Sequence, residues 1–281
     1  MAVTPPSLLE PSRFNPLLIV DDDLDDLASF TGMTPEDCRQ RLESYTHAEH
    51  AEAWRRADPK TPEEILDFYR STELYIWELM QWHASRERAP LWQALAAFVE
   101  RFPANSGYSR VYDFGCGIGT DGLFLADRGY EVTLVDVDGP TFSFAKLRFE
   151  RRGLPARFVE SRSPLPEPDG TYDAVICFDV FEHLPDPLEA ATRLVGALRP
   201  GGVLVQRGAF ESEEDHPCHL GENVRRFAGL RWDIHLARLG VRSEGFHMHR
   251  RVQTWERAAQ RFRYELWRLT GLWLLHVPKR P

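Results

Sequence analysis

The feature that most restricts the fold is an alternation of short β-rich runs with helical stretches, which begins at Arg110. The runs predict strands over residues 111–114, 132–135, 157–159, 174–178 and 203–206. Strands separated by helices form βαβ units, and these build a parallel sheet with helices on both faces. Later runs at 241–249 and 272–277 predict two more strands. We therefore expect an α/β fold with a Rossmann-like, doubly wound, mostly parallel seven-stranded sheet.

The residues before this alternation predict helices alone. Thr34-Pro35 and Thr61-Pro62 each place a capping hydroxyl before a proline at the first helical position. These signals predict helices over about 35–57 and 62–84, and apolar periodicity predicts a third over 90–102. Two more helical stretches are expected near 224–239 and 255–269. We expect an N-terminal α-helical cap or lid over residues 1–104 and the sheet domain over residues 105–281.

Charge and cysteine content restrict the partners and the compartment. The 281 residues carry a formal net charge of -9, which disfavours nucleic acids and anionic membranes as partners. No run approaches the roughly 18 apolar residues that a membrane span needs, and the N-terminus lacks the basic and apolar regions of a signal peptide. The four cysteines are too scattered for a disulfide framework. We expect a cytoplasmic protein, and the sequence does not indicate its oligomeric state.

A glycine-rich turn follows the first predicted strand. It reads Asp-Phe-Gly-Cys-Gly-Ile-Gly from Asp113 to Gly119, and its glycines allow a ligand to approach the backbone at a helix N-terminus. Dinucleotide enzymes typically show G-x-G-x-x-G, which places a pyrophosphate on the helix. Here the spacing is G-x-G-x-G, and an acid two residues before the first glycine would repel a pyrophosphate. That acid can receive an ammonium group, directly or through water, so the pattern favours a cofactor that carries an amino-acid group.

A second acid ends the next predicted strand. Asp136 comes 23 residues after Asp113 (136 − 113), and a carboxylate at this place can accept two hydrogen bonds from a ribose. Four motifs then follow one another in order: DFGCGIG, LVDVD, YDAVICFDVFEHLPDP and LRPGG. Over about residues 106–210 the chain resembles the class I S-adenosylmethionine-dependent methyltransferases, of the type that acts in ubiquinone and menaquinone biosynthesis.

The resemblance implies S-adenosylmethionine as the cofactor, with its contacts distributed over four segments. The methionine part maps onto Asp113, Gly115, Cys116, Gly117 and Gly119, the ribose onto Asp136, the adenine onto Val137, and the region near the sulfonium onto Phe178 and Asp179. After the third strand the family often has an acidic residue followed by a small one, whereas this chain reads VESRS from residue 159. Ser161 and Arg162 are the candidates there.

Two histidines are candidate catalytic bases, because imidazole titrates near neutrality. His183 follows Asp179-Val-Phe-Glu182 in a loop that faces the transferred methyl in this family, and His219 lies in the polar loop 211–223, at the carboxyl edge of the sheet. Alternative interpretations remain for both. The acid-x-x-Glu-His group ligates a divalent metal in the related ubiquinone-biosynthesis enzymes, and elsewhere in the superfamily it caps the following helix.

The loop 211–223 also allows two other interpretations. His216, Cys218 and His219 are residue types that bind zinc, although the spacing lacks a second paired element. The loop can equally be a solvated segment with no ligand. We therefore expect no metal. The N-terminal aromatic residues are predicted to be core, or a lid over the substrate pocket; they are Tyr69, Tyr75, Trp77, Trp82 and Trp92.

The expected enzyme is a transferase that moves a methyl group to O, N or C of a small-molecule metabolite by in-line displacement. Because the sulfonium methyl is already activated, the chain has to position the acceptor and remove a proton where the acceptor is a hydroxyl. The alternative is an S-adenosylmethionine-binding or partner-binding protein of the same fold without methyl transfer. A nicotinamide oxidoreductase is disfavoured by the glycine spacing and by Asp113.

Overall fold

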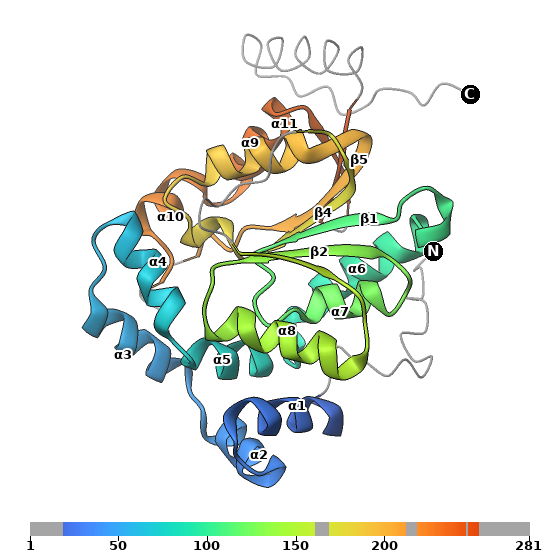
Figure 1. Cartoon of the computed structure of the whole chain (residues 1–281). Coiled ribbons are helices and arrows are strands. Elements are labelled where there is room, and N and C mark those ends of the chain that lie inside the picture. The colour runs from blue at the N-terminus through green and yellow to red at the C-terminus, as the bar shows by residue number, and fades with distance from the viewer. Residues whose placement is uncertain (1–18, 161–168, 212–217, 246, 253–281) are drawn as a thin grey trace.

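The computed structural model describes residues 19–160, 169–211, 218–245 and 247–252, and it contains a seven-stranded sheet with the order β3-β2-β1-β4-β5-β7-β6 (Figure 1). The strands are β1 (Arg110–Phe114), β2 (Glu131–Asp136), β3 (Arg157–Glu160), β4 (Tyr172–Phe178), β5 (Leu198–Arg207), β6 (Val241–Gly245) and β7 (Met248–Arg251). Strands β1 to β5 are parallel, and β7 is antiparallel to both β5 and β6. The Rossmann-like, mostly parallel seven-stranded sheet predicted from the sequence is confirmed.

The end of the sheet differs from the prediction. Residues 241–249 do not form one strand; they contain β6 and the start of β7, joined by a tight reversal at which His247 has a φ of +58°. The helix expected near 224–239 is two helices, α10 (Gly221–Phe227) and α11 (Leu230–Arg238). Gly229, with a φ of +66°, separates them, since this conformation is readily adopted only by glycine. The strand expected over 272–277 and the helix expected over 255–269 lie outside the described residues.

Among the residues that the structure describes, six α-helices precede the sheet: α1 (Asp21–Thr31), α2 (Pro35–Ser44), α3 (His47–Ala57), α4 (Pro62–Ser71), α5 (Leu74–His83) and α6 (Ala89–Arg101). The two predicted caps are present, because Thr34 and Thr61 accept from the backbone N–H groups of Asp37 and Glu64. The stretches 35–57 and 62–84 were each predicted as one helix, which is wrong: each contains two. The first is broken at Tyr45, after which Thr46 forms a capping box that starts α3.

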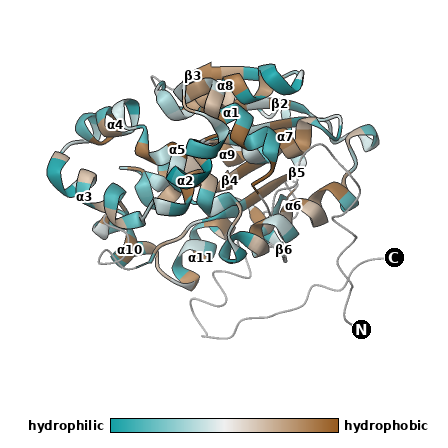
Figure 2. Cartoon of the chain, turned by 90° about the horizontal axis from the view of Figure 1, so that it is seen from below, coloured by the Kyte–Doolittle hydropathy of each residue, from teal (hydrophilic) through white to brown (hydrophobic). Residues whose placement is uncertain are grey.

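Helices cover both faces of the sheet. One core cluster joins α6, α7 (Thr120–Ala126) and α8 (Pro140–Arg152) to one face, and a second joins α9 (Pro187–Ala197), α10 and α11 to the other. The view from below shows hydrophobic central strands between these helices, with α3 and α4 mostly hydrophilic (Figure 2). Because α6 packs into the first cluster, the last helix of the predicted 1–104 cap contacts the sheet domain directly. Helices α3, α4 and α5 lie beyond the carboxyl ends of β1, β2 and β4 (Figure 1).

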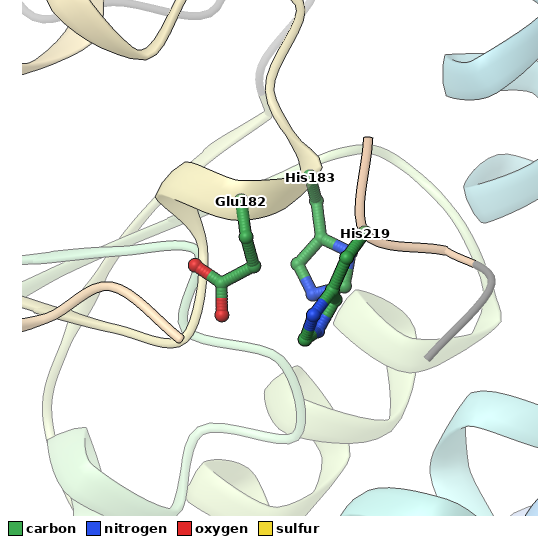
Figure 3. Close-up of side chains that lie close together, drawn as sticks. All are labelled: Glu182, His183 and His219. Carbon is green, nitrogen blue, oxygen red and sulfur yellow. The ribbon is translucent and has the colours of Figure 1, made fainter. Parts of the chain in front are cut away.

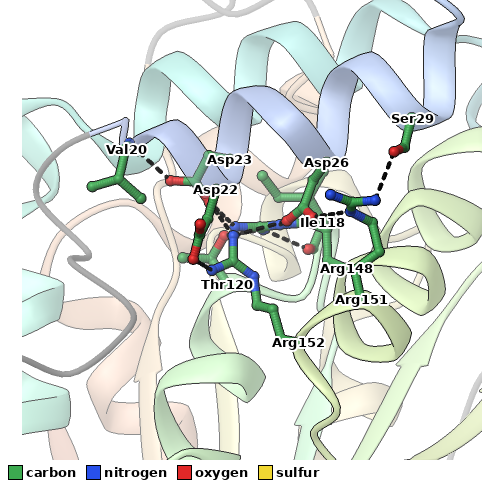
Figure 4. Close-up of polar contacts among 10 residues, drawn as sticks. All are labelled: Val20, Asp22, Asp23, Asp26, Ser29, Ile118, Thr120, Arg148, Arg151 and Arg152. Atoms are coloured by element: carbon green, nitrogen blue, oxygen red, sulfur yellow. Dashed lines mark hydrogen bonds and ion pairs between the residues drawn. The ribbon is translucent and has the colours of Figure 1, made fainter. Parts of the chain in front are cut away.

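Helix α1 is attached to α8 through a cluster of ion pairs (Figure 4). The carboxylates of Asp23 and Asp26 face Arg148, Arg151 and Arg152, with N–O distances from 2.6 to 3.6 Å. The four buried side chains of this cluster are at most 8% exposed, and that of Arg151 is 40% exposed. In a cluster this buried, each charge offsets the desolvation cost of its neighbours, since a single buried charge without a partner would be costly in free energy.

Candidate active site

A cavity of about 650 Å³ lies at the carboxyl edge of the parallel strands, between the sheet and helices α3 to α5. This is the edge at which open α/β sheets bind their ligands. The residues predicted from the sequence that line the cavity are Gly115, Cys116, Gly117, Asp136, Val137, Phe178, Asp179, His183 and His219. Ser161 and Arg162 lie outside the described residues.

The glycine loop forms one wall of the cavity with bare backbone. Gly115 and Gly117 have φ values of +67° and +55°, which side chains other than glycine rarely adopt. A Cβ atom on Gly115 would lie 2.4 Å from a methyl carbon of Val180, and one on Gly117 would lie 2.6 Å from a methyl carbon of Leu79. The third glycine, Gly119, packs against α8 and β2 and does not line the cavity. The absence of a Cβ atom on these two glycines therefore allows Val180 and Leu79 to pack directly against the backbone that lines the cavity.

Asp136 is fixed at the end of β2 by two backbone hydrogen bonds. Its Oδ2 accepts from the N–H of Gly117 at 2.6 Å, and its Oδ1 accepts from the N–H of Val137 at 2.7 Å. Burial raises the pKa of Asp136 to about 6, against the lowering effect of these two bonds. Each carboxylate oxygen keeps a further lone pair, so both hydroxyls of a ribose fit this group.

Asp113, the acid before the glycines, lies deeper than the resemblance implied. It is 2% exposed and is not among the cavity-lining residues, and its Oδ2 has no hydrogen-bond partner within the described part of the chain. Burial and the nearby charge of Asp121 raise the pKa of Asp113 well above its ordinary value. Asp121 itself lines the cavity, eight residues further along the chain.

Sequence reasoning missed a buried cation in the same wall. Arg88 is 2% exposed and lines the cavity, and its Nη2 lies 2.7 Å from Asp121 Oδ2. Its Nε and Nη1 have no hydrogen-bond partner among the residues that the structure describes. No local pattern marks Arg88, because its partner is 33 residues away. Together with Asp121 it offers one cation and one anion, which suits the carboxylate and the ammonium of an amino acid.

Asp179 stands in an unusual backbone conformation at the end of β4. Its φ of +54° is uncommon outside glycine, and such residues cluster at functional sites. The carboxylate lies 3.3 Å from Arg207 Nε, and burial raises its pKa above the ordinary value. Phe178 is next to it and 8% exposed. The strand end therefore offers one apolar ring and one constrained acid to the middle of the cavity.

His183 is held by its Nδ1 atom, which lies 3.1 Å from the carbonyl of Cys218 and 3.0 Å from the hydroxyl of Tyr69. With the proton on Nδ1 the ring donates to the carbonyl and has its lone pair on Nε2; with Nδ1 unprotonated the ring accepts from the Tyr69 hydroxyl instead. The ring of His219 lies 4.8 Å away, centroid to centroid (Figure 3). The two histidines predicted as bases are therefore adjacent.

The same place offers ligand atoms to a metal ion. Glu182, His183 and His219 each have one such atom within 4.8 Å of the others, and Figure 3 shows the three side chains close together. Glu182 is fully buried, and burial raises its pKa well above the ordinary value. The set differs from the zinc alternative that the sequence left open: the thiol of Cys218 faces His50 at 3.8 Å, and His216 lies outside the described residues.

The aromatic residues of the cap divide into two groups. Tyr69, Tyr75 and Trp82 line the cavity, as the lid interpretation requires. Trp77 and Trp92 belong to hydrophobic clusters and are 7% and 1% exposed. The cap therefore contributes three aromatic rings to the cavity lining.

The strand order, the glycine loop and the strand-end acid together define a Rossmann-like domain built for a nucleoside cofactor. Comparison with known proteins identifies the class, because residues 112–206 match the family described as "Methyltransferase domain". Residues 112–206 therefore match the class I S-adenosylmethionine-dependent methyltransferases, as the motif resemblance predicted, and the cofactor of that class is S-adenosylmethionine.

Two curated relatives are similar over the same region. The ubiquinone biosynthesis O-methyltransferase of Marinobacter nauticus is 35% identical over 97 residues, which are 33% of this chain and 41% of that one. The glycine N-methyltransferase of Rattus norvegicus is 35% identical over 117 residues, 35% of this chain and 40% of that one. This chain thus spans less than half the length of either relative.

A solved S-adenosylmethionine-dependent methyltransferase from Mesorhizobium loti is 23% identical, with 43% of this chain and 54% of that one covered and a TM-score of 0.35. None of the helices in the described residues combines the length and the hydropathy that crossing a bilayer requires.

Proposed function

We propose that this chain transfers the methyl group of S-adenosylmethionine to O, N or C of a small-molecule acceptor by in-line displacement. The observation that carries the proposal is the two-walled cavity, in which the bare backbone of Gly115 and Gly117 and the carboxylate of Asp136 face the aromatic cap. The cofactor supplies an already activated methyl group. The chain then needs to orient the acceptor, exclude water and remove a proton where one has to leave.

The cofactor contacts that we propose are those of the sequence, with two additions. Those that line the cavity are Gly115, Cys116, Gly117, Asp136, Val137, Phe178 and Asp179, and Ser161 and Arg162 are proposed with them. Asp113 and Gly119 lie behind the cavity wall and support it. Arg88 and Asp121 are added because both line the cavity beside the glycine loop. Arg88 suits the carboxylate of the methionine part, and Asp121 suits its ammonium group, with Asp113 behind it.

We propose His183 as the catalytic base and His219 as the second candidate. The support for His183 is its place in the cavity wall and its Nδ1 contact with the carbonyl of Cys218; in the tautomer that donates to this carbonyl, the Nε2 lone pair can take a proton. Replacement of His183 by Gln should lower the rate for a hydroxyl acceptor about a hundredfold, the lower end of what general base catalysis contributes. If this variant turned over at the wild-type rate, His183 would not be the catalytic base.

The class of acceptor has mixed support from the relatives. One relative is named for O-methylation in ubiquinone biosynthesis and another for N-methylation of glycine, so both hydroxyl and amine acceptors agree with the similarity. The net charge of -9 supports a small metabolite over a nucleic acid as the acceptor.

The four cysteines are buried free thiols, which supports a reducing, cytoplasmic location. The division into a cap over 1–104 and a methyltransferase domain over 105–281 is part of the same proposal.

The test is calorimetric titration with S-adenosylhomocysteine, repeated on Asp136→Ala and on the neighbouring Asp138→Ala. Micromolar binding that is lost in Asp136→Ala and kept in Asp138→Ala supports the cofactor site. A screen of acceptors with labelled S-adenosylmethionine then tests the transfer. Absence of binding by the folded wild-type chain would overturn the proposal. Binding without transfer to any acceptor would favour the alternative, a cofactor-binding or partner-binding protein of this fold.

A further inference from the structure

The first two helices of the cap support the glycine loop from outside the cavity. No described residue of α1 or α2 lines the cavity. Ile118, which lies between Gly117 and Gly119 in the loop, has no exposed surface. Its side chain belongs to a hydrophobic cluster that includes Leu24 and Leu27 of α1, together with residues of α2, α5 and α8. The loop therefore presents bare backbone to the cavity and one side chain to the core of the cap.

A buried arginine holds the backbone of the same loop residue. The side chain of Arg148 is 1% exposed, and its Nη1 donates to the carbonyl of Ile118 at 2.8 Å. Its Nη2 donates to Oδ1 of Asp23 at 2.9 Å, while its Nε lies 3.6 Å from Oδ2 of Asp26 (Figure 4). A guanidinium can hold these partners at once because its N–H groups form a rigid, planar fork. The position of the Ile118 carbonyl therefore depends on where the two carboxylates of α1 hold the guanidinium.

The proposed cofactor site begins one residue away from this contact. Gly117, directly before Ile118, lines the cavity and donates its N–H to Oδ2 of Asp136 at 2.6 Å. This bond orients the carboxylate that is proposed to hold the ribose. Because a closely packed interior transmits displacements, a shift of Ile118 would move both the backbone of Gly117 and the carboxylate of Asp136.

We propose that α1 controls cofactor affinity from outside the cavity: Asp23 and Asp26 hold Arg148, and Arg148 positions the glycine loop through Ile118. Arg148 is a positioning residue in this arrangement, and the two carboxylates act through it. The inference rests on the proposed function, which assigns the glycine loop to S-adenosylmethionine. It divides the cap into α1 and α2, which support the cofactor wall, and α3 to α5, which line the cavity. Since coupling between sites is reciprocal, bound cofactor must also stabilise the docking of α1.

Calorimetric titration with S-adenosylhomocysteine tests the proposal on two variants, neither of which changes a cavity-lining residue. Asp23→Asn keeps the shape of the side chain and removes its charge. Arg148→Lys keeps the charge but cannot hold α1 and the loop at the same time. Each variant should bind about tenfold more weakly, within the usual range of coupling between two sites. Asp25→Asn, which neutralises an exposed carboxylate on the same helix, is the matched control and should bind as the wild type does.

A second control separates positioning from stability. Leu236→Ala on α11 removes a fully buried side chain on the opposite face of the sheet. It should destabilise the chain but leave the affinity within about twofold of the wild type, because the site is distant. Circular dichroism at the temperature of titration verifies that each variant is folded.

The reciprocal effect is measured on the wild-type chain, which needs no substitution. Saturating S-adenosylhomocysteine should slow hydrogen exchange of the α1 backbone amides about tenfold, the same factor as the loss of affinity. Unchanged affinity in Asp23→Asn and Arg148→Lys, an equal loss in Leu236→Ala, or unchanged exchange in α1 would overturn the inference alone. A folded wild-type chain that does not bind S-adenosylhomocysteine would overturn the proposed function and this inference with it, so the two failures are distinguishable.

Discussion

The guanidinium of Arg148 lies 2.9 Å from Oδ1 of Asp23 and joins α8 to α1 in a place that water hardly reaches. Its other terminal nitrogen, Nη1, donates to the carbonyl of Ile118 at 2.8 Å and contacts the hydroxyl of Thr120 at 2.9 Å. Ile118 comes directly after Gly117, and Thr120 is the first residue of α7. Through one arginine, the first helix of the cap therefore supports the end of the glycine loop and the start of α7.

Replacement of Asp23 by Ala should destabilise the chain strongly. The change removes the carboxylate that faces both Arg148 and Arg152, and it leaves buried cations with less compensation. Breaking a buried ion pair in this way costs about 3 kcal/mol. Urea unfolding measures the loss. The control is Asp25→Ala, which removes the same charge from an exposed position of the same helix and should change the free energy of unfolding by less than about 0.5 kcal/mol.

Replacement of Gly115 by Ala should abolish cofactor binding, whereas the same change at Gly153 should not. Both glycines have positive φ values, +67° and +62°, so both substitutions carry a backbone cost of about 1 kcal/mol. A Cβ on Gly153 meets nothing within 4 Å, but one on Gly115 meets Val180 at 2.4 Å. We expect Gly115→Ala to lower the affinity for S-adenosylhomocysteine at least about tenfold, by displacing the loop. Similar affinities of the two variants would contradict this.

The strands and the glycine loop could be predicted because their signals are local. Each parallel strand is a short apolar run, and the loop has its acid and its glycines within seven residues. The role of Asp136 as a ribose ligand was predicted from its spacing to Asp113 alone. Helix α1 was missed for an equally local reason: its N-cap is Val20, which has no side-chain oxygen to mark the start.

The missed site residues depend on tertiary contacts. Arg88 acquires its position from Asp121, and His50 from Glu78, 28 residues away on another helix (78 − 50). A histidine on an amphipathic helix has no sequence signal that distinguishes a cavity wall from an exposed face. The deep position of Asp113 has a similar cause, because burial depends on Arg88 and α7 packing over the end of β1, which the DFGCGIG motif does not encode.

Replacement of Glu182 by Gln should leave stability nearly unchanged at low pH and raise it at high pH. Glu182 is fully buried, and burial raises its pKa well above the ordinary value, so the native chain binds this proton more tightly than the unfolded chain does. Wild-type stability should therefore fall as pH rises above the unfolded pKa, by up to about 1.4 kcal/mol per pH unit until the folded pKa is reached. The variant lacks this dependence.

Urea unfolding at pH 5 and pH 8 measures the effect. The control is Glu189→Gln on α9, where the carboxylate is half exposed and pairs with Arg193 at the surface. It should leave the pH profile of stability as it is in the wild type. A profile of Glu182→Gln that matches the wild type would mean that Glu182 does not retain its proton in the folded chain.

Cofactor binding should weaken in acid because of Asp136. Its pKa is raised to about 6, and only the carboxylate form can accept hydrogen bonds from both hydroxyls of a ribose. The affinity for S-adenosylhomocysteine should be constant above pH 7 and about tenfold lower at pH 5, since protonation then competes with binding. Calorimetric titration across this range measures it. Asp138→Asn, two residues further along the chain, should show the same profile as the wild type.

Protonation of Asp136 does not itself destabilise the fold, because Asp136 acts on stability in the opposite direction. A carboxyl group whose folded pKa exceeds its ordinary value of 3.8 favours the fold in its protonated form. The contribution of Asp136 to stability should therefore decrease as pH rises from about 4 to 6, while cofactor affinity increases over the upper part of that range. Asp136→Asn removes both trends, so a variant that lost affinity but kept the wild-type pH profile would place the titrating group elsewhere in the cavity.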